Sequence, residues 1–166
     1  MQLFQRRRWV DPHRLTEGSA AFVRQLEWID AHTSMDMAGW RLADSDRLGA
    51  ILATTTYDDH DWFLAEKDYL QTLSAYGPVN NAAAALTVGE DTFERWDSVE
   101  DLPVGWSLDD TFWQVTDPKD VEPSGEAATR WTNVEGAAGC IVWFLGGDGP
   151  MAELTGARVE RWERIH

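Results

Sequence analysis

The sequence predicts an α+β domain: two main helices packed on a mostly antiparallel sheet, with a strand-rich second half. Three observations favour this class. Apolar residues before Gly77 recur at the spacing of amphipathic helices. After Val104 the sequence has short apolar runs bounded by turn residues, as in hairpins. The length of 166 residues is that of one domain, so we treat 1–166 as a single α+β domain.

The first half is expected to contain a strand and both main helices. Met1 to Val10 has the composition of a strand. Asp11-Pro12 predicts a helix start, because a capping acceptor precedes a proline whose missing N–H costs nothing there. That helix should run from about Leu15 to Ala31. A second helix should cover 60–76 and end at Gly77-Pro78, with the glycine in a left-handed conformation.

Two segments fit either a short helix or a strand, namely Asp44 to Thr54 and Asn80 to Val88. The clearest strand is Cys140 to Leu145. Six consecutive apolar residues predict a central strand that is buried on both faces. The other expected strands are 111–116, 128–134 and a run that ends near Ile165.

Cysteine usage and hydropathy bear on the compartment. The single cysteine, Cys140, cannot form an internal disulfide, so nothing indicates an oxidising compartment. No apolar stretch approaches the ~20 residues that cross a membrane. The basic run Arg6-Arg7-Arg8 is not followed by the apolar segment of a signal peptide. We therefore expect a cytoplasmic protein with no membrane partner.

The net charge of −15 restricts the partners. Such a field repels nucleic acid and attracts basic partners. The same composition, with two lysines among 14 basic residues, also fits adaptation of the protein to high salt. In that case the charge says nothing about partners, and the sequence leaves both explanations open.

Acidic and aromatic residues alternate between Glu90 and Glu126. Twelve acidic residues stand against Arg95 and Lys119, a net charge of −10. Charge around aromatic anchors is common in tight protein interfaces, although acidic runs are also ordinary solvated surfaces. The candidate partner-binding residues are Trp96, Asp97, Glu100, Asp101, Trp106, Asp109, Asp110 and Trp113.

A second cluster offers an alternative site with acid–base chemistry. Asp58, Asp59, His60 and Asp61 place a histidine among carboxylates, which suits a general base or a ligand of a divalent metal. The same carboxylates would also cap the helix predicted to begin near His60. No second histidine lies at ligand spacing, so we expect no metal site and no cofactor.

The sequence contains no phosphate-binding loop, nucleophile elbow, HExxH or paired CxxC motif, which favours a protein that is not an enzyme. The main hypothesis is an acidic binding protein that neutralises a basic protein partner, specifically an immunity protein that inhibits a toxin. The alternative is a small enzyme or a small-molecule-binding domain with an aromatic-lined pocket, for which ten tryptophans supply the material.

Overall fold

A computed structural model describes residues 1–43, 49–102, 110–116, 128–134, 140–145 and 158–166. Its elements, in chain order, are β1 (Gln2–Trp9), a 3-10 turn (Pro12–Arg14), α1 (Leu15–His32), β2 (Ala38–Leu42), β3 (Ala50–Tyr57), α2 (His60–Thr72), α3 (Tyr76–Ala84), β4 (Thr92–Ser98), β5 (Thr111–Thr116), β6 (Ala128–Asn133), β7 (Cys140–Leu145) and β8 (Arg158–Arg164).

The strands close into a barrel in the order β1-β3-β2-β8-β5-β7-β6-β4. Every pairing in it is antiparallel. The predicted α+β class with an antiparallel sheet is therefore confirmed. Strand β7 pairs with both β5 and β6, so Cys140 to Leu145 is a central strand as predicted. Whether the Cys140 side chain is buried lies outside the described part of the structure.

Side chains of β1 alternate between the inside and the outside of the barrel. Leu3 belongs to the interior cluster, whereas Phe4 packs with the residues under the helices. Aromatic residues dominate the barrel interior, and several of the ten tryptophans lie there. Those that are at most 4% exposed are Trp40, Trp96, Trp131, Trp143 and Trp162.

Arg7 from β1 crosses the barrel interior to Glu160 of β8. Two hydrogen bonds join them, Nη1 to Oε1 at 3.1 Å and Nη2 to Oε2 at 2.8 Å. The guanidinium also lies 5.3 Å from the ring of Trp162. Because two hydrogen bonds join the two groups, their attraction offsets the cost of removing both charges from water. Removing one partner would leave an unpaired buried charge and destabilise the protein.

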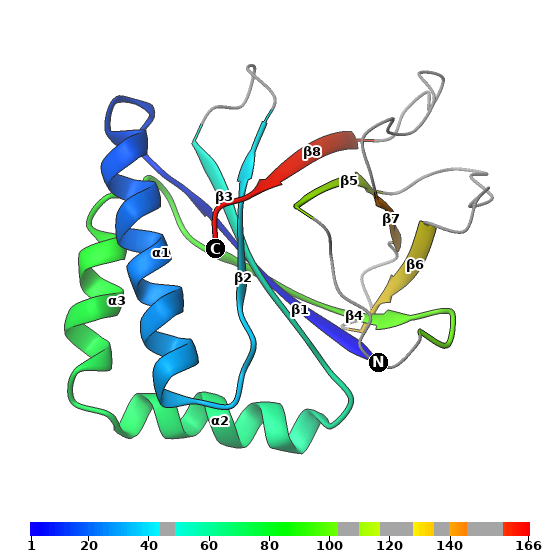
Figure 1. The fold of residues 1–166 in the computed structure, drawn as a ribbon, viewed down its shortest axis with the longest axis horizontal. Helices are drawn as coiled ribbons and strands as arrows, with labels where there is room; N and C mark the ends of the chain where they lie inside the picture. Colours follow the sequence, from blue (N-terminus) through cyan, green and yellow to red (C-terminus); the bar gives the residue numbers. More distant parts are fainter. Residues whose placement is uncertain (44–48, 103–109, 117–127, 135–139, 146–157) are drawn as a thin grey trace.

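The three helices lie on one side of the barrel, next to β1, β2 and β3, and strands β5 to β8 form the other side (Figure 1). Beneath the helices is a second apolar cluster, separate from the barrel interior, that includes Phe22, Leu26, Met35, Phe63 and Leu70. The molecule thus has two apolar regions that share the wall formed by β1 and β3.

The predicted helices are confirmed, but the reason given for the end of the second one is wrong. α2 ends at Thr72, and Leu73 adopts an extended conformation. Gly77 does not have a positive φ, and Gly77 and Pro78 lie in the first turn of α3. Proline fits there because the first helical N–H groups have no intrahelical acceptor. Of the ambiguous segments, 50–57 is a strand and 80–84 is helical.

Among the described residues, no helix is long and apolar enough to cross a membrane.

Candidate functional site

A cavity of about 650 Å³ lies between the helices and the outer face of the barrel. This volume is within the range of small-molecule sites. Its lining consists of Phe4, Arg6, Phe22, Leu26, Ile29, Met35, Met37, Ala53, Phe63, Lys67, Leu70, Gln71, Leu73, Ser74, Tyr76, Gly77, Asn80, Asn81 and Phe93.

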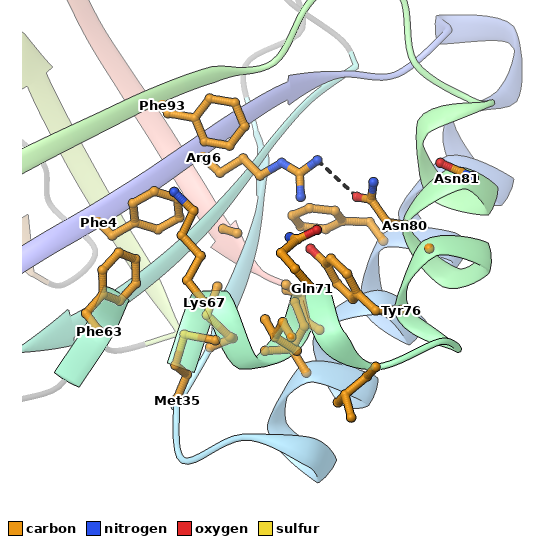
Figure 2. Close-up of a pocket in the computed structure, with 18 of the residues that line it drawn as sticks. Phe4, Arg6, Met35, Phe63, Lys67, Gln71, Tyr76, Asn80, Asn81 and Phe93 are labelled. Carbon is orange, nitrogen blue, oxygen red and sulfur yellow. Dashed lines mark hydrogen bonds between the residues drawn. The ribbon is translucent and has the colours of Figure 1, made fainter. Parts of the chain in front are cut away.

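Aromatic and aliphatic side chains form most of the cavity wall. Figure 2 shows Phe4 and Phe93 on the side of the strands, Phe63 beside Phe4, and Tyr76 on the opposite side. The Phe4 ring centroid lies 5.2 Å from that of Phe63 and 6.2 Å from that of Phe93. Such a wall offers planar apolar surfaces to a ligand.

One end of the cavity is polar because Arg6 points along it. Its Nη2 donates to Oδ1 of Asn80 at 3.3 Å, the bond drawn in Figure 2, and its Nε donates to Oδ2 of Asp91 at 2.8 Å. Arg8 donates to both oxygens of Asp91, at 2.9 and 2.8 Å. Gln25 of α1 donates to Oδ1 of Asn80 at 2.8 Å. This network holds α1 and α3 against β1.

The network changes the acidity of Asp91. Burial acts to raise the pKa of this carboxyl, but hydrogen bonds from Arg8 and Arg6, together with their positive charges, outweigh it and hold the pKa below its usual value of 3.8. Asp91 is therefore ionised at neutral pH, and it balances part of the charge of two arginines.

A smaller hollow of about 210 Å³ adjoins the cavity and shares Phe4, Phe63, Lys67 and Phe93 with it. His60 and Arg95 line its far end. Nη1 of Arg95 lies close to both ring nitrogens of His60, so the guanidinium is in direct contact with the imidazole.

The hydroxyl of Tyr57 lies beside His60. Its oxygen is 3.4 Å from Nδ1 of His60. Burial raises the pKa of Tyr57, while the charge of Arg95 lowers it and that of Asp97 raises it. Tyr57 is therefore a neutral hydroxyl that can exchange a hydrogen bond with the histidine.

The predicted acid–base cluster separates in the structure. Asp58 is exposed and lies 3.6 Å from the N-terminal amine. Asp59 caps α2 by accepting from the N–H groups of Asp61 and Trp62. Asp61 is exposed. His60 lines the hollow, and among the described residues no three His, Cys, Asp or Glu side chains gather closely enough to hold a metal ion.

The candidate partner-binding residues are placed unevenly. Trp96 is 4% exposed and belongs to the barrel interior. Glu100 is exposed and accepts a hydrogen bond from the N–H of Arg130 at 2.9 Å. Asp97 and Trp113 are half-buried, Asp101 and Asp110 are exposed, and Trp106 and Asp109 lie outside the described residues.

Most cavity residues were absent from the candidates chosen from sequence. Lining residues come from β1, α1, the segment before β2, β3, α2, α3 and β4, and no local motif joins segments so far apart. One local signal existed in Arg6-Arg7-Arg8. Within a strand, consecutive arginines must face opposite sides, so at least one had to enter a buried environment and find partners.

The fold has known counterparts. The sequence matches no family model and no curated protein. A putative monooxygenase from Fusobacterium nucleatum subsp. nucleatum superposes with a TM-score of 0.63 at 12% identity, covering 99% of this chain and 92% of that one. A putative monooxygenase from Lactobacillus acidophilus NCFM gives 0.60 at 9%, covering 98% and 93%. A putative chlorite dismutase gives 0.52 at 8%, covering 99% and 96%.

The chain has the fold of these structures. The main hypothesis from the sequence, an immunity protein that inhibits a basic toxin, is therefore wrong, because the fold is that of proteins described as putative monooxygenases and a putative chlorite dismutase, and not of toxin inhibitors. The predicted basic protein partner is wrong for the same reason. A physical reason for the error is that Trp96, chosen as an exposed anchor, fills the barrel interior.

Proposed function

We propose that this protein is a small-molecule-binding enzyme whose ligand occupies the cavity between the helices and the barrel. The observation that carries the proposal is the cavity itself: about 650 Å³, with five aromatic rings and a few polar groups at one end. Apolar walls with few oriented polar groups are the usual design of a ligand site.

The reaction class belongs to the same proposal. Two of the solved structures that match nearly the whole of both chains, with TM-scores of 0.63 and 0.60, are described as putative monooxygenases, which supports oxygenation of a bound organic substrate. Of the predicted acid–base cluster, we retain His60, because it alone lines a hollow next to the cavity. We place the protein in the cytoplasm, because its single cysteine suits a reducing compartment.

The first prediction tests occupancy of the cavity with N-phenyl-1-naphthylamine, a neutral aromatic probe that fluoresces in apolar surroundings. We expect the native protein to raise its fluorescence in a saturable way. Ala53 is 1% exposed and lines the cavity, so Ala53→Leu should extend into that space, weaken probe binding and leave thermal stability nearly unchanged.

The matched control is Ala50→Leu in the same strand. Ala50 is also 1% exposed but belongs to the packed barrel interior, where an added side chain should cost about 1–3 kcal/mol of stability without affecting probe affinity. The proposal fails if the native protein does not bind the probe, or if Ala53→Leu binds it as well as the native protein does.

A further inference from the structure

The charged residues that line the cavity are positive, although the protein as a whole is strongly negative. The chain has 29 acidic residues against 14 basic ones. Yet the charged residues that line the cavity are Arg6 and Lys67, and no aspartate or glutamate is among the lining residues. In so acidic a protein, a cavity lined by two cations and no anion needs an explanation.

Arg6 has its own anionic partner. Asp91 and Asn80 accept its hydrogen bonds, and its guanidinium carbon lies 5.5 Å from the centroid of the Phe93 ring. Because Asp91 also balances Arg8, which is 1% exposed, this part of the lining is explained by the packing of helices on β1.

Lys67 is different, because no ion pair or hydrogen bond links its ammonium group to any residue that the structure describes. It extends from α2 toward β1 and ends beside Phe4, as Figure 2 shows. Lys67 is an exposed residue that lines both the cavity and the adjoining hollow, together with Phe4, Phe63 and Phe93. Glu94 also lines the hollow, but it forms no ion pair with Lys67. A lysine among aromatic rings at the junction of two hollows is available to a ligand.

We propose that the ligand is an aromatic or otherwise planar apolar molecule that bears an anionic group, and that Lys67 binds this group. This inference rests on the proposed function and adds the chemical class of the ligand. The rings of the wall bind the apolar body, and the ammonium group pairs with a carboxylate, sulfonate or phenolate at its edge. The charge of Lys67 thus favours an acidic ligand over its neutral analogue.

Two probes that share one ring system test this inference. 8-Anilino-1-naphthalenesulfonate is the sulfonated counterpart of N-phenyl-1-naphthylamine. In Lys67→Gln, the affinity for the sulfonate should fall about fivefold, the upper range for one exposed charge pair, while the affinity for the neutral probe should change less than about twofold. Arg14→Gln removes one positive charge from an exposed pair with Glu17, away from the cavity, and should alter neither affinity.

The outcomes separate the two proposals. If the native protein binds neither probe, the proposed function fails and this inference fails with it. If it binds the neutral probe but Lys67→Gln leaves the sulfonate affinity unchanged, the ligand class alone is wrong. Equal losses for both probes in Lys67→Gln would also overturn the inference, because they would show that Lys67 contributes its hydrocarbon chain and not its charge.

Discussion

At the scale of single residues, Asp91 links two arginines of β1 to the polar end of the cavity. Arg8 is 1% exposed, and Asp91 is the carboxylate with which it pairs. Removing that carboxylate leaves a buried guanidinium without its counterion, which is the most costly way to break an ion pair. The network therefore determines both the position of Arg6 and the attachment of the helices.

Asp91→Asn should lower the free energy of unfolding at pH 7 by about 3 kcal/mol. The substitution should also change how the free energy of unfolding depends on pH. Because the pKa of Asp91 is lower in the folded state than the usual 3.8, the unfolded chain binds the proton first, and stability falls as the pH drops from about 5 through the folded pKa. Denaturant titrations between pH 2 and 7 should show that the free energy of unfolding falls less steeply with decreasing pH in the variant than in the native protein.

Glu17→Gln is the control for this experiment. Glu17 is 63% exposed and pairs with Arg14, which is 49% exposed, so its loss should cost less than about 0.5 kcal/mol. If Asp91→Asn behaves like Glu17→Gln, the network does not hold the helices in place.

Sequence reasoning at this scale found His60 of the adjoining hollow, but neither Lys67 of the cavity wall nor Asp91, which pairs with Arg6. His60 stands out locally because it lies among three aspartates. No comparable local cluster marks Asp91 in the sequence, and its partners Arg6 and Arg8 are more than 80 positions away. Only the pairing of β1 with β4 brings them together, and a sequence pattern does not specify a pairing between strands so far apart.

At the scale of elements, two glycines in helices have opposite surroundings. A Cβ on Gly18 of α1 would lie 2.2 Å from Cγ1 of Val10, which is 1% exposed. A Cβ on Gly77 of α3 would meet nothing within 4 Å. Gly18 thus allows α1 to approach the end of β1, and Gly77 has no comparable role.

Gly18→Ala should therefore destabilise the protein by about 1–2 kcal/mol, because overpacking exceeds the gain in helix propensity. Gly77→Ala should stabilise it by up to about 1 kcal/mol. Thermal unfolding of the two variants without ligand gives the comparison. A stabilised Gly18→Ala would mean that α1 does not pack closely on Val10.

Element types followed from sequence wherever apolar spacing was regular, as in α1 and β5. The division between α2 and α3 did not. Gly77-Pro78 suits both the end of a helix and the start of one. In the structure α2 ends earlier, because Leu73 is extended, and Gly77-Pro78 therefore lies at the start of α3. Tertiary packing decided between two locally acceptable structures.

At the scale of the whole molecule, barrel closure separates two apolar regions that composition alone cannot distinguish. Ten tryptophans predicted either a thick aromatic core or a binding surface. At least five fill the barrel interior, whereas phenylalanines and Tyr76 supply the rings of the cavity. The sequence predicted the fold class and one antiparallel sheet, but closure depends on β1 pairing with β4, and β2 with β8.

The central claim is that the ligand binds beneath the helices and not inside the barrel, and methionine methyl groups report on both places. Met35 and Met37 line the cavity, and Met1 packs against the barrel interior. In ¹³C-methyl NMR spectra, assigned by single Met→Leu variants, saturating N-phenyl-1-naphthylamine should shift the signals of Met35 and Met37 through the ring current of the probe and leave that of Met1 in place. A shift of the Met1 signal with Met35 and Met37 unchanged would contradict the account.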